Sequence, residues 1–363
     1  MTLGAEIELQ VLDATSRDLS PGAPALLERL TSEPRIKPEL LQAMLEVSSG
    51  VCDDVGQLKA DLQETIARLR AAGRTLGLTF SAAGSHPFAS WRDRLIYPGE
   101  RFQYLIDRNR WLARRLMIFG LHVHVGMRDG AHAVAMLNGI LPYLPHALAL
   151  SASSPFWHGY DTGLASSRIT LFEALPTAGH PCTFRTWEEF QALYRAMIRS
   201  RAVTSIKDLW WDVRLHPDYG TVELRICDGL PTLSEAVAMV ALVQLLFARL
   251  DRYRDGRTFE PPPYWILREN KWRASRWGLD AEIVVDERGH TRLLRDEMGQ
   301  LLPALEPLAV SLGCSTELRR LGAIVEHGPS YARQRRVFEP RRQLAAVVEA
   351  LTYEFETDDL WEG

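Results

Sequence analysis

The pattern of hydrophobic and polar positions is clearest at the start of the chain. Over residues 3–12, apolar side chains alternate with small or polar ones, and the acidic positions are Glu6 and Glu8. An alternation with a period of two predicts a β-strand with one buried face. The two carboxylates therefore project side by side from the other face, with Cα atoms about 6–7 Å apart.

Other segments carry strand-like or helix-like patterns. Short apolar runs bounded by turn residues predict strands, whereas apolar residues repeated at helical spacing predict helices. The segments on either side of residues 216–220 have the pattern of an antiparallel hairpin. The predicted strands are 44–51, 78–83, 119–127, 209–215 and 221–227. The predicted helices are 55–76, 131–150, 187–203, 233–253, 301–321 and 343–355.

These elements predict an α+β fold. No internal repeat and no shift in composition divides the sequence, so we expect one domain over residues 1–363 with a helical flank from about residue 298 to 363. The longest apolar tract, residues 236–250, contains Gln244 and Arg249 and is shorter than a bilayer requires. It therefore predicts a buried helix, and no membrane association is expected.

Charge and cysteine content narrow the classes of function. A formal net charge of −4 gives no basic surface to neutralise a nucleic-acid backbone, so no nucleic-acid partner is expected. The four cysteines lack the close spacing of a zinc site or a disulfide framework. The chain also begins without the pattern of a secretory signal. We therefore expect a cytoplasmic protein.

Pairs of ionisable residues two positions apart point to a metal site. Two carboxylates on one strand face, such as Glu6 and Glu8, suit Mg²⁺ or Mn²⁺, although a solvated strand face has the same pattern. His122 and His124 share a face in the same way and indicate either a metal or phosphate contact or a hydrogen-bonded structural pair. Glu46 is a further strand-borne acid among apolar neighbours.

Glu223 and Arg225 extend the pattern to another strand. They could neutralise one another, or Glu223 could bind a metal while Arg225 binds a phosphate or carboxylate. Several strands that place ionisable residues on one face favour a cation-filled site, because unpaired burial of such groups is costly. Glycine-rich phosphate loops are absent, so basic side chains would have to assist the metals. Candidates lie in residues 269–278, 166–168 and 207–214.

Nine ordered motifs resemble those of the bacterial glutamate-cysteine ligase 2, or carboxylate-amine ligase, family. They span nearly the whole chain: TLGAEIELQ (2–10), ELLQAMLE (39–46), GSHPF (84–88), FGLHVHVG (119–126), ASSR (165–168), IKD (206–208), WDVR (211–214), GTVELR (220–225) and NKWRASRWG (270–278). The resemblance implies a curved antiparallel sheet with helices on one face, like the catalytic domains of glutamine synthetase and the guanidino kinases.

The resemblance also implies roles for individual residues. It assigns the metal ions, Mg²⁺ or Mn²⁺, to Glu6, Glu8, Glu46, His122 and Glu223. It places Arg225, Lys271 and Arg276 in catalysis and His124, Lys207, Asn270, Lys271 and Arg276 at ATP. It gives substrate binding to His86, Arg168 and Arg214.

The implied reaction is ATP-dependent amide formation through an acyl phosphate. Its substrates would be a small carboxylic acid such as glutamate and an amine such as cysteine, and the family resemblance also implies a homo-oligomer, most simply a dimer. Three alternatives stay open at this point. They are an ATP phosphotransferase of guanidino-kinase type, a nucleotide-binding protein without turnover, and a metal hydrolase built on His122 and His124.

Overall fold

The protein is built around one antiparallel sheet. The structure, a computed structural model, describes residues 1–254 and 259–362. The central long strand is β1 (Leu3–Asp13), and β4 (Leu78–Ser81) pairs with its far end, residues 10–13, beyond the part that pairs with β5 (Gly120–Gly126). In spatial order the remaining path is β2 (Ile36–Pro38), β3 (Met44–Ser48), β1 (Leu3–Asp13), β5 (Gly120–Gly126), β9 (Thr221–Asp228) and β8 (Val213–His216), with β4 at Leu78–Ser81.

The register of the strands aligns the ionisable side chains in rows. Glu6 on β1 lies opposite His122 on β5, and Glu8 lies opposite Glu46 on β3. One strand further across, His124 lies opposite Glu223 on β9. Residues that face each other across antiparallel strands point to the same side of the sheet. The pairing therefore brings the sequence-predicted acids and imidazoles onto one face.

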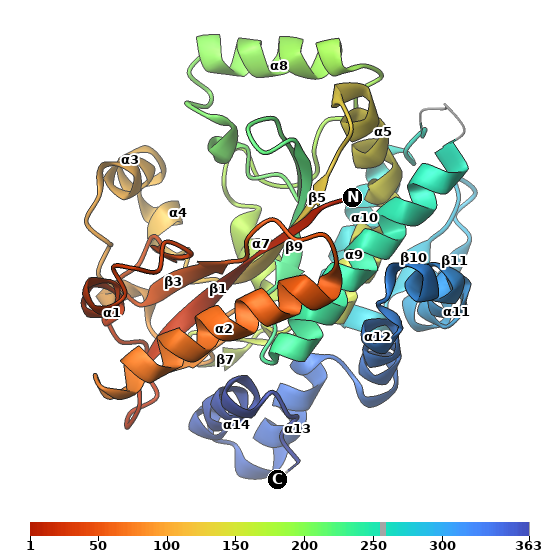
Figure 1. Ribbon diagram of the computed structural model, residues 1–363. Coiled ribbons are helices and arrows are strands. Elements are labelled where there is room, and N and C mark those ends of the chain that lie inside the picture. Colours follow the sequence, from red (N-terminus) through yellow and green to blue (C-terminus); the bar gives the residue numbers. More distant parts are fainter. Residues whose placement is uncertain (255–258, 363) are drawn as a thin grey trace.

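Helices cover the other face of this sheet. The apolar positions of β1 and β5 point toward α2 (Val55–Arg74), α5 (Gly130–Ile140), α6 (Leu144–Ser151) and α9 (Leu233–Arg254) and form the main core with them. Figure 1 shows α2 and α9 running along this face. Burial of these side chains supplies most of the driving force for folding. The predictions of an α+β fold with an antiparallel sheet are confirmed.

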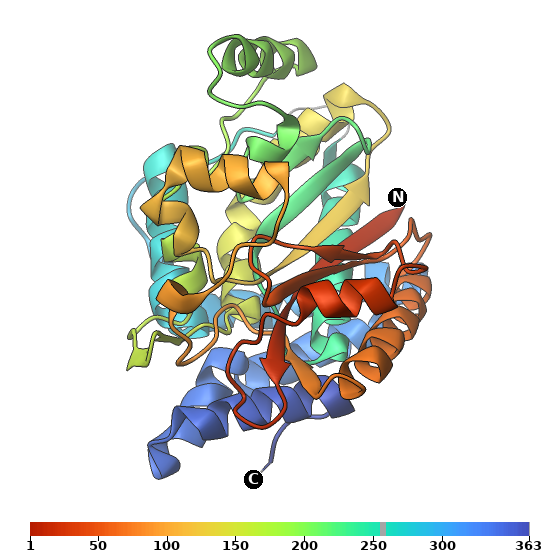
Figure 2. The ribbon, with the colours of Figure 1, turned by 90° about the vertical axis from the view of Figure 1, so that its left-hand side faces the viewer.

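The face with the ionisable rows is partly enclosed rather than packed. α3 (Glu100–Asn109), α7 (Ser167–Phe172) and a 3₁₀ turn, η3 (Ile206–Asp208), contribute side chains around it. Figure 2 gives the side view of these segments around the strands. Helix α8 (Trp187–Arg199) stands apart at one end in both views, with Phe190 as its one buried side chain.

The chain from Leu294 to Thr357 is helical. The prediction of one helix over 301–321 is wrong, because Gly313, with φ of 70°, ends α11 in the left-handed region that favours glycine. The segment therefore forms α11 (Leu294–Leu312) and α12 (Ser315–His327). It is followed by α13 (Ser330–Arg341) and α14 (Leu344–Thr357), which Figure 1 shows together at the lower end. The predicted flank extends to Gly363, which lies outside the described residues.

Two other predictions needed correction. The helix expected over 131–150 is interrupted by the 3₁₀ turn η2 (Leu141–Tyr143), where Pro142 and Pro145 cannot donate the backbone hydrogen bonds of a continuous helix. The strand expected over 209–215 begins only at Val213, because the Asp212 N–H donates instead to the Gly179 carbonyl.

The remaining elements are short or lie outside the main sheet. They are α1 (Ala23–Arg29), η1 (Trp91–Asp93), α4 (Trp111–Arg114), β6 (Phe156–Trp157), β7 (Tyr160–Asp161), α10 (Tyr264–Trp277), η4 (Gly278–Asp280), β10 (Glu282–Val284) and β11 (Thr291–Leu293). Two stretches, Gly130–Ser151 and Leu233–Arg254, are long and apolar enough to cross a bilayer, but most of each lies buried inside the fold. The predicted buried helix over 236–250 is confirmed.

Candidate functional site

A cavity of about 390 Å³ opens on the ionisable face of the sheet. Its floor consists of charged and imidazole side chains from β1, β3, β5, β8 and β9. Its walls come from α3, α7 and the 3₁₀ turn η3, and they include apolar side chains such as Phe102, Leu105 and Phe172. The cavity thus combines a polar floor with partly apolar walls, as small-molecule sites do.

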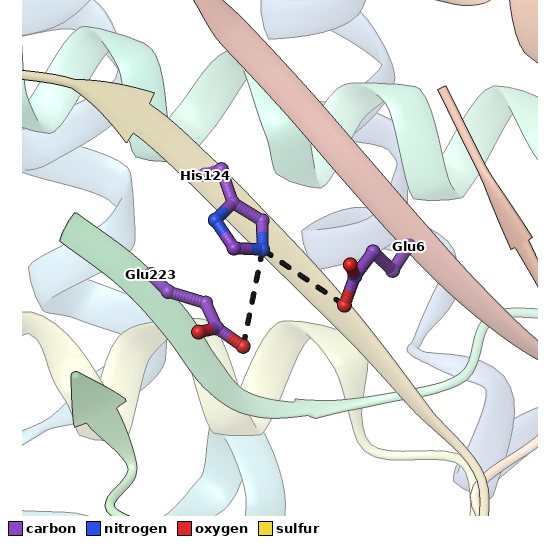
Figure 3. A group of neighbouring side chains, drawn as sticks. All are labelled: Glu6, His124 and Glu223. Carbon is purple, nitrogen blue, oxygen red and sulfur yellow. Dashed lines mark ion pairs between the residues drawn. The ribbon is translucent and has the colours of Figure 1, made fainter. Parts of the chain in front are cut away.

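Five side chains on this face of the sheet form what we call the metal-ligand cluster: Glu6, Glu46, His122, His124 and Glu223. Four of them line the cavity, and Glu223 is fully buried beside them. The five side chains fall into two triads that share Glu6. Within Glu6, Glu46 and His122, the three potential ligand atoms all lie within 4.8 Å of one another. The same limit holds for Glu6, His124 and Glu223, which Figure 3 shows converging from three neighbouring strands. A shared carboxylate between two triads suits a pair of neighbouring cations.

The imidazoles show why a cation fits this cluster. His124 Nε2 lies 3.8 Å from Glu6 Oε2 and 3.9 Å from Glu223 Oε1, too far for hydrogen bonds. Nε2 of His122 is likewise buried without a hydrogen-bond partner and lies 3.8 Å from Glu8 Oε1. Two ligands each about 2.1 Å from one Mg²⁺ are themselves about 3–4 Å apart. The geometry and the oxygen–nitrogen donor set therefore fit divalent cations.

The second ring nitrogen of each histidine is held by the protein. His124 Nδ1 lies 3.0 Å from the Thr221 hydroxyl, and His122 Nδ1 lies 3.3 Å from Glu6 Oε2. A hydrogen bond at one ring nitrogen fixes the orientation of the ring and leaves the other nitrogen as the available ligand. This arrangement directs Nε2 of His124 into the cluster.

Burial and neighbouring charges move the pKa values of the carboxyl groups in opposite directions. Burial alone would raise the pKa of Glu6, but hydrogen bonds and charge from His122 and His124 hold it well below its usual value. Burial and the charge of Glu6 instead raise the pKa of Glu46. Crowded carboxylates of this kind are stabilised by cations, which supply the missing positive charge.

Glu223 is fully buried and is neutralised by two arginines. Burial would raise its pKa, but the charges of Arg225 and Arg214 hold it below the usual range. Arg214 Nε and Nη2 both donate to Glu223 Oε2, at 2.8 and 2.6 Å, and Arg225 donates to Glu223 Oε1. Arg214 also donates to the Ile206 and Leu209 carbonyls. Most N–H donors of Arg214 are therefore occupied by acceptors of the protein, whereas Arg225 Nε has no hydrogen-bond partner among the described residues.

Two further carboxyl groups border the cluster. Glu8 lines the cavity and accepts a hydrogen bond from the Gly120 N–H, which directs it toward His122 rather than into either triad. Glu39 was not singled out from the sequence, although it opens the 39–46 motif. It also lines the cavity, and burial together with the charges of Glu46 and Glu8 raises its pKa to about 8.

Two lysines contact the cavity differently. Lys37, which sequence reasoning missed, donates to Glu46 at 3.2 Å and to the Ser48 hydroxyl at 2.9 Å. Lys37 lies opposite Glu46 where β2 pairs with β3, and this pairing has no local signal in the sequence. Lys207, from the 206–208 motif, lines the cavity with an exposed side chain, and its role at ATP stays a prediction.

Arg168 is the buried cation at the inner end of the cavity. It is only 2% exposed, and its guanidinium makes just three long hydrogen bonds, each 3.4 Å, to the carbonyls of Arg225 and Ile226. Its Nε has no hydrogen-bond partner among the described residues. A Cβ at Gly120 would overlap the guanidinium, so glycine leaves it room. Such an under-used buried cation can bind an anion.

Besides Glu223, four predicted site residues are not among those that line this cavity. His86 accepts from the Ala89 N–H at 3.0 Å and contacts the Arg17 carbonyl, and burial lowers its pKa to about 4. Asn270 exchanges two hydrogen bonds with the backbone of Val284. Lys271 is buried against Asp212 at 2.7 and 2.8 Å, and Arg276 donates to the Gly163 carbonyl. Their assigned roles in substrate and ATP binding stay predictions.

The fold that carries the cluster is the one that glutamate-cysteine ligases adopt. One solved structure with this architecture is the glutamate-cysteine ligase of Francisella tularensis in complex with AMP. It superposes with a TM-score of 0.71 over 99% of this chain and 89% of that chain, at 13% sequence identity. At so low an identity the similarity shows the fold alone.

Sequence comparison then defines the family. The profile of the family described as "Glutamate-cysteine ligase family 2(GCS2)" matches residues 2–350, and the chain belongs to this family. A protein of Bdellovibrio bacteriovorus named "Putative glutamate--cysteine ligase 2" is 45% identical over 98% of this chain and 95% of its own length. One of the same name from Thermobifida fusca is 45% identical over 98% and 90%. The predicted family, and with it the class of ATP-dependent carboxylate-amine ligase, is confirmed.

Proposed function

We propose that this ligase joins the γ-carboxylate of glutamate, or of a closely related small acid, to an amine such as cysteine. In the proposed reaction the carboxylate oxygen takes the γ-phosphoryl group of ATP and ADP leaves. The amine nitrogen then attacks the acyl carbon, phosphate leaves, and the nitrogen loses a proton. No nucleophile from the protein is needed, so catalysis depends on positioning and on electrostatic stabilisation.

The observation that carries this proposal is the metal-ligand cluster. Its five side chains come from four strands, and two of its buried imidazole nitrogens lack hydrogen-bond partners. Mg²⁺ or Mn²⁺ bound there would neutralise the phosphate oxygens of ATP and the charge that develops during phosphoryl transfer. We assign Glu6, Glu46, His122, His124 and Glu223 as its ligands, with Glu8 at its border.

The chain's own cations have separate tasks in this proposal. Arg225 is held beside the cluster by Glu223 and by a 3.4 Å contact with His122 Nδ1, where it can stabilise a transferring phosphoryl group. Arg168 lies at the inner end of the cavity, where its guanidinium can bind a substrate carboxylate. Lys207, exposed on the wall, can contact phosphate or carboxylate groups as they enter.

A screen of ADP release tests the proposal. Purified protein would be supplied with ATP, Mg²⁺ or Mn²⁺, and glutamate against all amino acids and common amines, and amide products would be identified by mass spectrometry. We expect ADP release that requires both an acid and an amine. Glu6→Gln should lower turnover at least a hundredfold, because Glu6 is common to both triads.

A matched control is Glu282→Gln, which alters an exposed carboxylate on the short strand β10 and should retain wild-type turnover. Two outcomes would contradict the proposal. ADP release that is independent of the amine, with a phosphorylated acid as the product, would support the phosphotransferase alternative. ATP binding without any product across the whole panel would support a binding protein without turnover.

A further inference from the structure

A buried carboxylate, Asp228, lies behind Arg168 at the end of β9. Its side chain is fully buried and accepts three hydrogen bonds. The Ser153 N–H donates to it at 2.9 Å, the Ser154 hydroxyl at 2.7 Å and the Ser166 hydroxyl at 2.8 Å. Burial raises the pKa of Asp228, and the charge of Arg168 opposes this rise. Asp228 therefore interacts with the arginine without touching the cavity.

The hydroxyl groups of Ser154 and Ser166 connect Asp228 to the first turn of helix α7 by hydrogen bonds. A serine hydroxyl has one proton, so a hydroxyl that donates to Asp228 can only accept from other groups. The Ser154 oxygen accepts from the Arg168 N–H at 3.0 Å. The Ser166 oxygen accepts from the Ile169 N–H at 3.4 Å as the N-cap of α7. Asp228 thereby orders the backbone of the helical turn that carries Arg168.

Few other contacts hold the tip of Arg168, and its cation–π contact with Phe172, 5.7 Å from the ring centroid, comes from the same helix. Its hydrogen bonds to the Arg225 and Ile226 carbonyls are all 3.4 Å long, and its Nε has no partner. The direction of the guanidinium thus depends on the position of its own backbone. A misplacement of a substrate-orienting group by about 1 Å can cost a hundredfold in rate. The backbone anchor is consequently a part of the site.

We propose that Asp228 is a positioning residue for the ligase reaction, which acts through Ser154 and Ser166 to hold Arg168 in the orientation that binds the carboxylate of the acid substrate. This inference rests on the proposed function, because it needs an acid substrate at Arg168. It adds a residue that makes no contact with substrate, metal or nucleotide. It also gives the ASSR motif at 165–168 a physical role, since Ser166 is the cap and Arg168 is the group that the cap positions.

Asp228→Asn tests the role with a side chain of nearly the same shape. An amide offers one acceptor oxygen and one NH₂ group to three donors, so its NH₂ must donate to a serine hydroxyl, whose proton then turns away from residue 228. The hydroxyl no longer donates to this side chain, and its bond to the Arg168 or Ile169 backbone N–H is no longer held in place. We expect KM for the acid substrate to rise about tenfold, which corresponds to about 1.4 kcal/mol. KM for ATP should change less than about twofold, since the metal-ligand cluster is untouched.

Two variants keep the test decisive. Ser166→Ala removes the cap and leaves the carboxylate, so it should raise KM for the acid in the same way if Asp228→Asn does not fold. Ser151→Ala is the matched control, because this buried hydroxyl donates to the Ala147 and Leu148 carbonyls of its own helix and, among the described residues, has no hydrogen bond with Asp228, Ser154, Ser166 or Arg168. It should leave both KM values unchanged.

A double-mutant cycle with Arg168→Lys separates positioning from a general loss of structure. If Asp228 acts through Arg168, Asp228→Asn should raise KM for the acid by less than about twofold in the Arg168→Lys background. An equal effect in both backgrounds, or wild-type KM values in both Asp228→Asn and Ser166→Ala, would overturn the inference. If the wild-type protein forms no product, the proposed function itself is wrong, and this is known before any variant is compared.

Discussion

Replacement of Glu223 by glutamine should destabilise the fold even when no metal is present. Glu223 is fully buried between Arg214 and Arg225, whose side chains are 6% and 11% exposed. Removal of one partner of a buried ion pair typically costs about 3–5 kcal/mol, because the remaining charge is left without compensation. Arg214 keeps its bonds to two backbone carbonyls and Arg225 stays close to other carboxylates, so we expect about 3 kcal/mol, at the lower end of that range.

Glu46→Gln is the control, because it removes the same kind of charge from the same cluster. Burial and the charge of Glu6 raise the pKa of Glu46 and the charge of Lys37 opposes this rise, so the net effect of folding is to disfavour the charge of Glu46 rather than to stabilise it. Glutamine removes this crowding. The free energy of unfolding should therefore stay within about 1 kcal/mol of the wild-type value or increase.

The assay is equilibrium unfolding in urea at pH 7.5 with EDTA, followed by tryptophan fluorescence and extrapolated linearly to water. Both variants should lose ligase activity when Mg²⁺ is restored, so that stability and activity separate. The reasoning fails if Glu223→Gln is within about 1 kcal/mol of wild type, or if Glu46→Gln is destabilised to the same extent.

Three further predictions concern other parts of the molecule. Gly120→Ala should raise KM for the acid substrate at least tenfold in steady-state kinetics, because the new Cβ would overlap the Arg168 guanidinium; an unchanged KM would show that Arg168 does not bind the acid. Arg333→Met should lower the free energy of unfolding by about 3 kcal/mol in urea titrations, because Glu235 and Glu354 lose their buried partner, with wild-type KM values in the protein that remains folded. Burial lowers the pKa of His146 to about 4, so on acidification this imidazole is protonated in the unfolded chain before it is protonated in the folded protein. The free energy of unfolding therefore decreases as the pH falls from about 6.5 to 4. Urea titrations across this pH range should show the free energy of unfolding of His146→Gln rising relative to that of wild type, by up to about 1.4 kcal/mol for each unit by which the pH falls. A difference that does not change with pH would contradict this.

The sequence predicted the strands that carry the site because their signal is local. In β1 an alternation of apolar and polar positions shows which side chains share a face, and Glu6 and Glu8 do project from the face opposite the core. The hairpin of β8 and β9 likewise followed from turn residues and apolar runs. Helix boundaries were less accurate where a single residue decides them, as Gly313 does between α11 and α12.

The pairing of side chains from distant segments could not be predicted in this way. Which carboxylate meets which imidazole depends on strand register, and a register is set by the packing of the whole sheet. Glu8 and His124 show the consequence: both were identified, but Glu8 turns to the Gly120 N–H whereas His124 joins Glu6 and Glu223. The salt bridge of Lys271 with Asp212 joins residues 59 positions apart and has no local signal.

The central claim is that the metal-ligand cluster binds the divalent cations that hold ATP. The most direct measurement is the binding of Mn²⁺ to metal-free protein with a non-hydrolysable ATP analogue, with free Mn²⁺ followed by electron paramagnetic resonance. The two triads predict two Mn²⁺ ions per wild-type chain, loss of both in Glu6→Gln because the triads share this residue, and wild-type binding in Glu282→Gln. Equal Mn²⁺ binding by the wild type and Glu6→Gln would contradict the account.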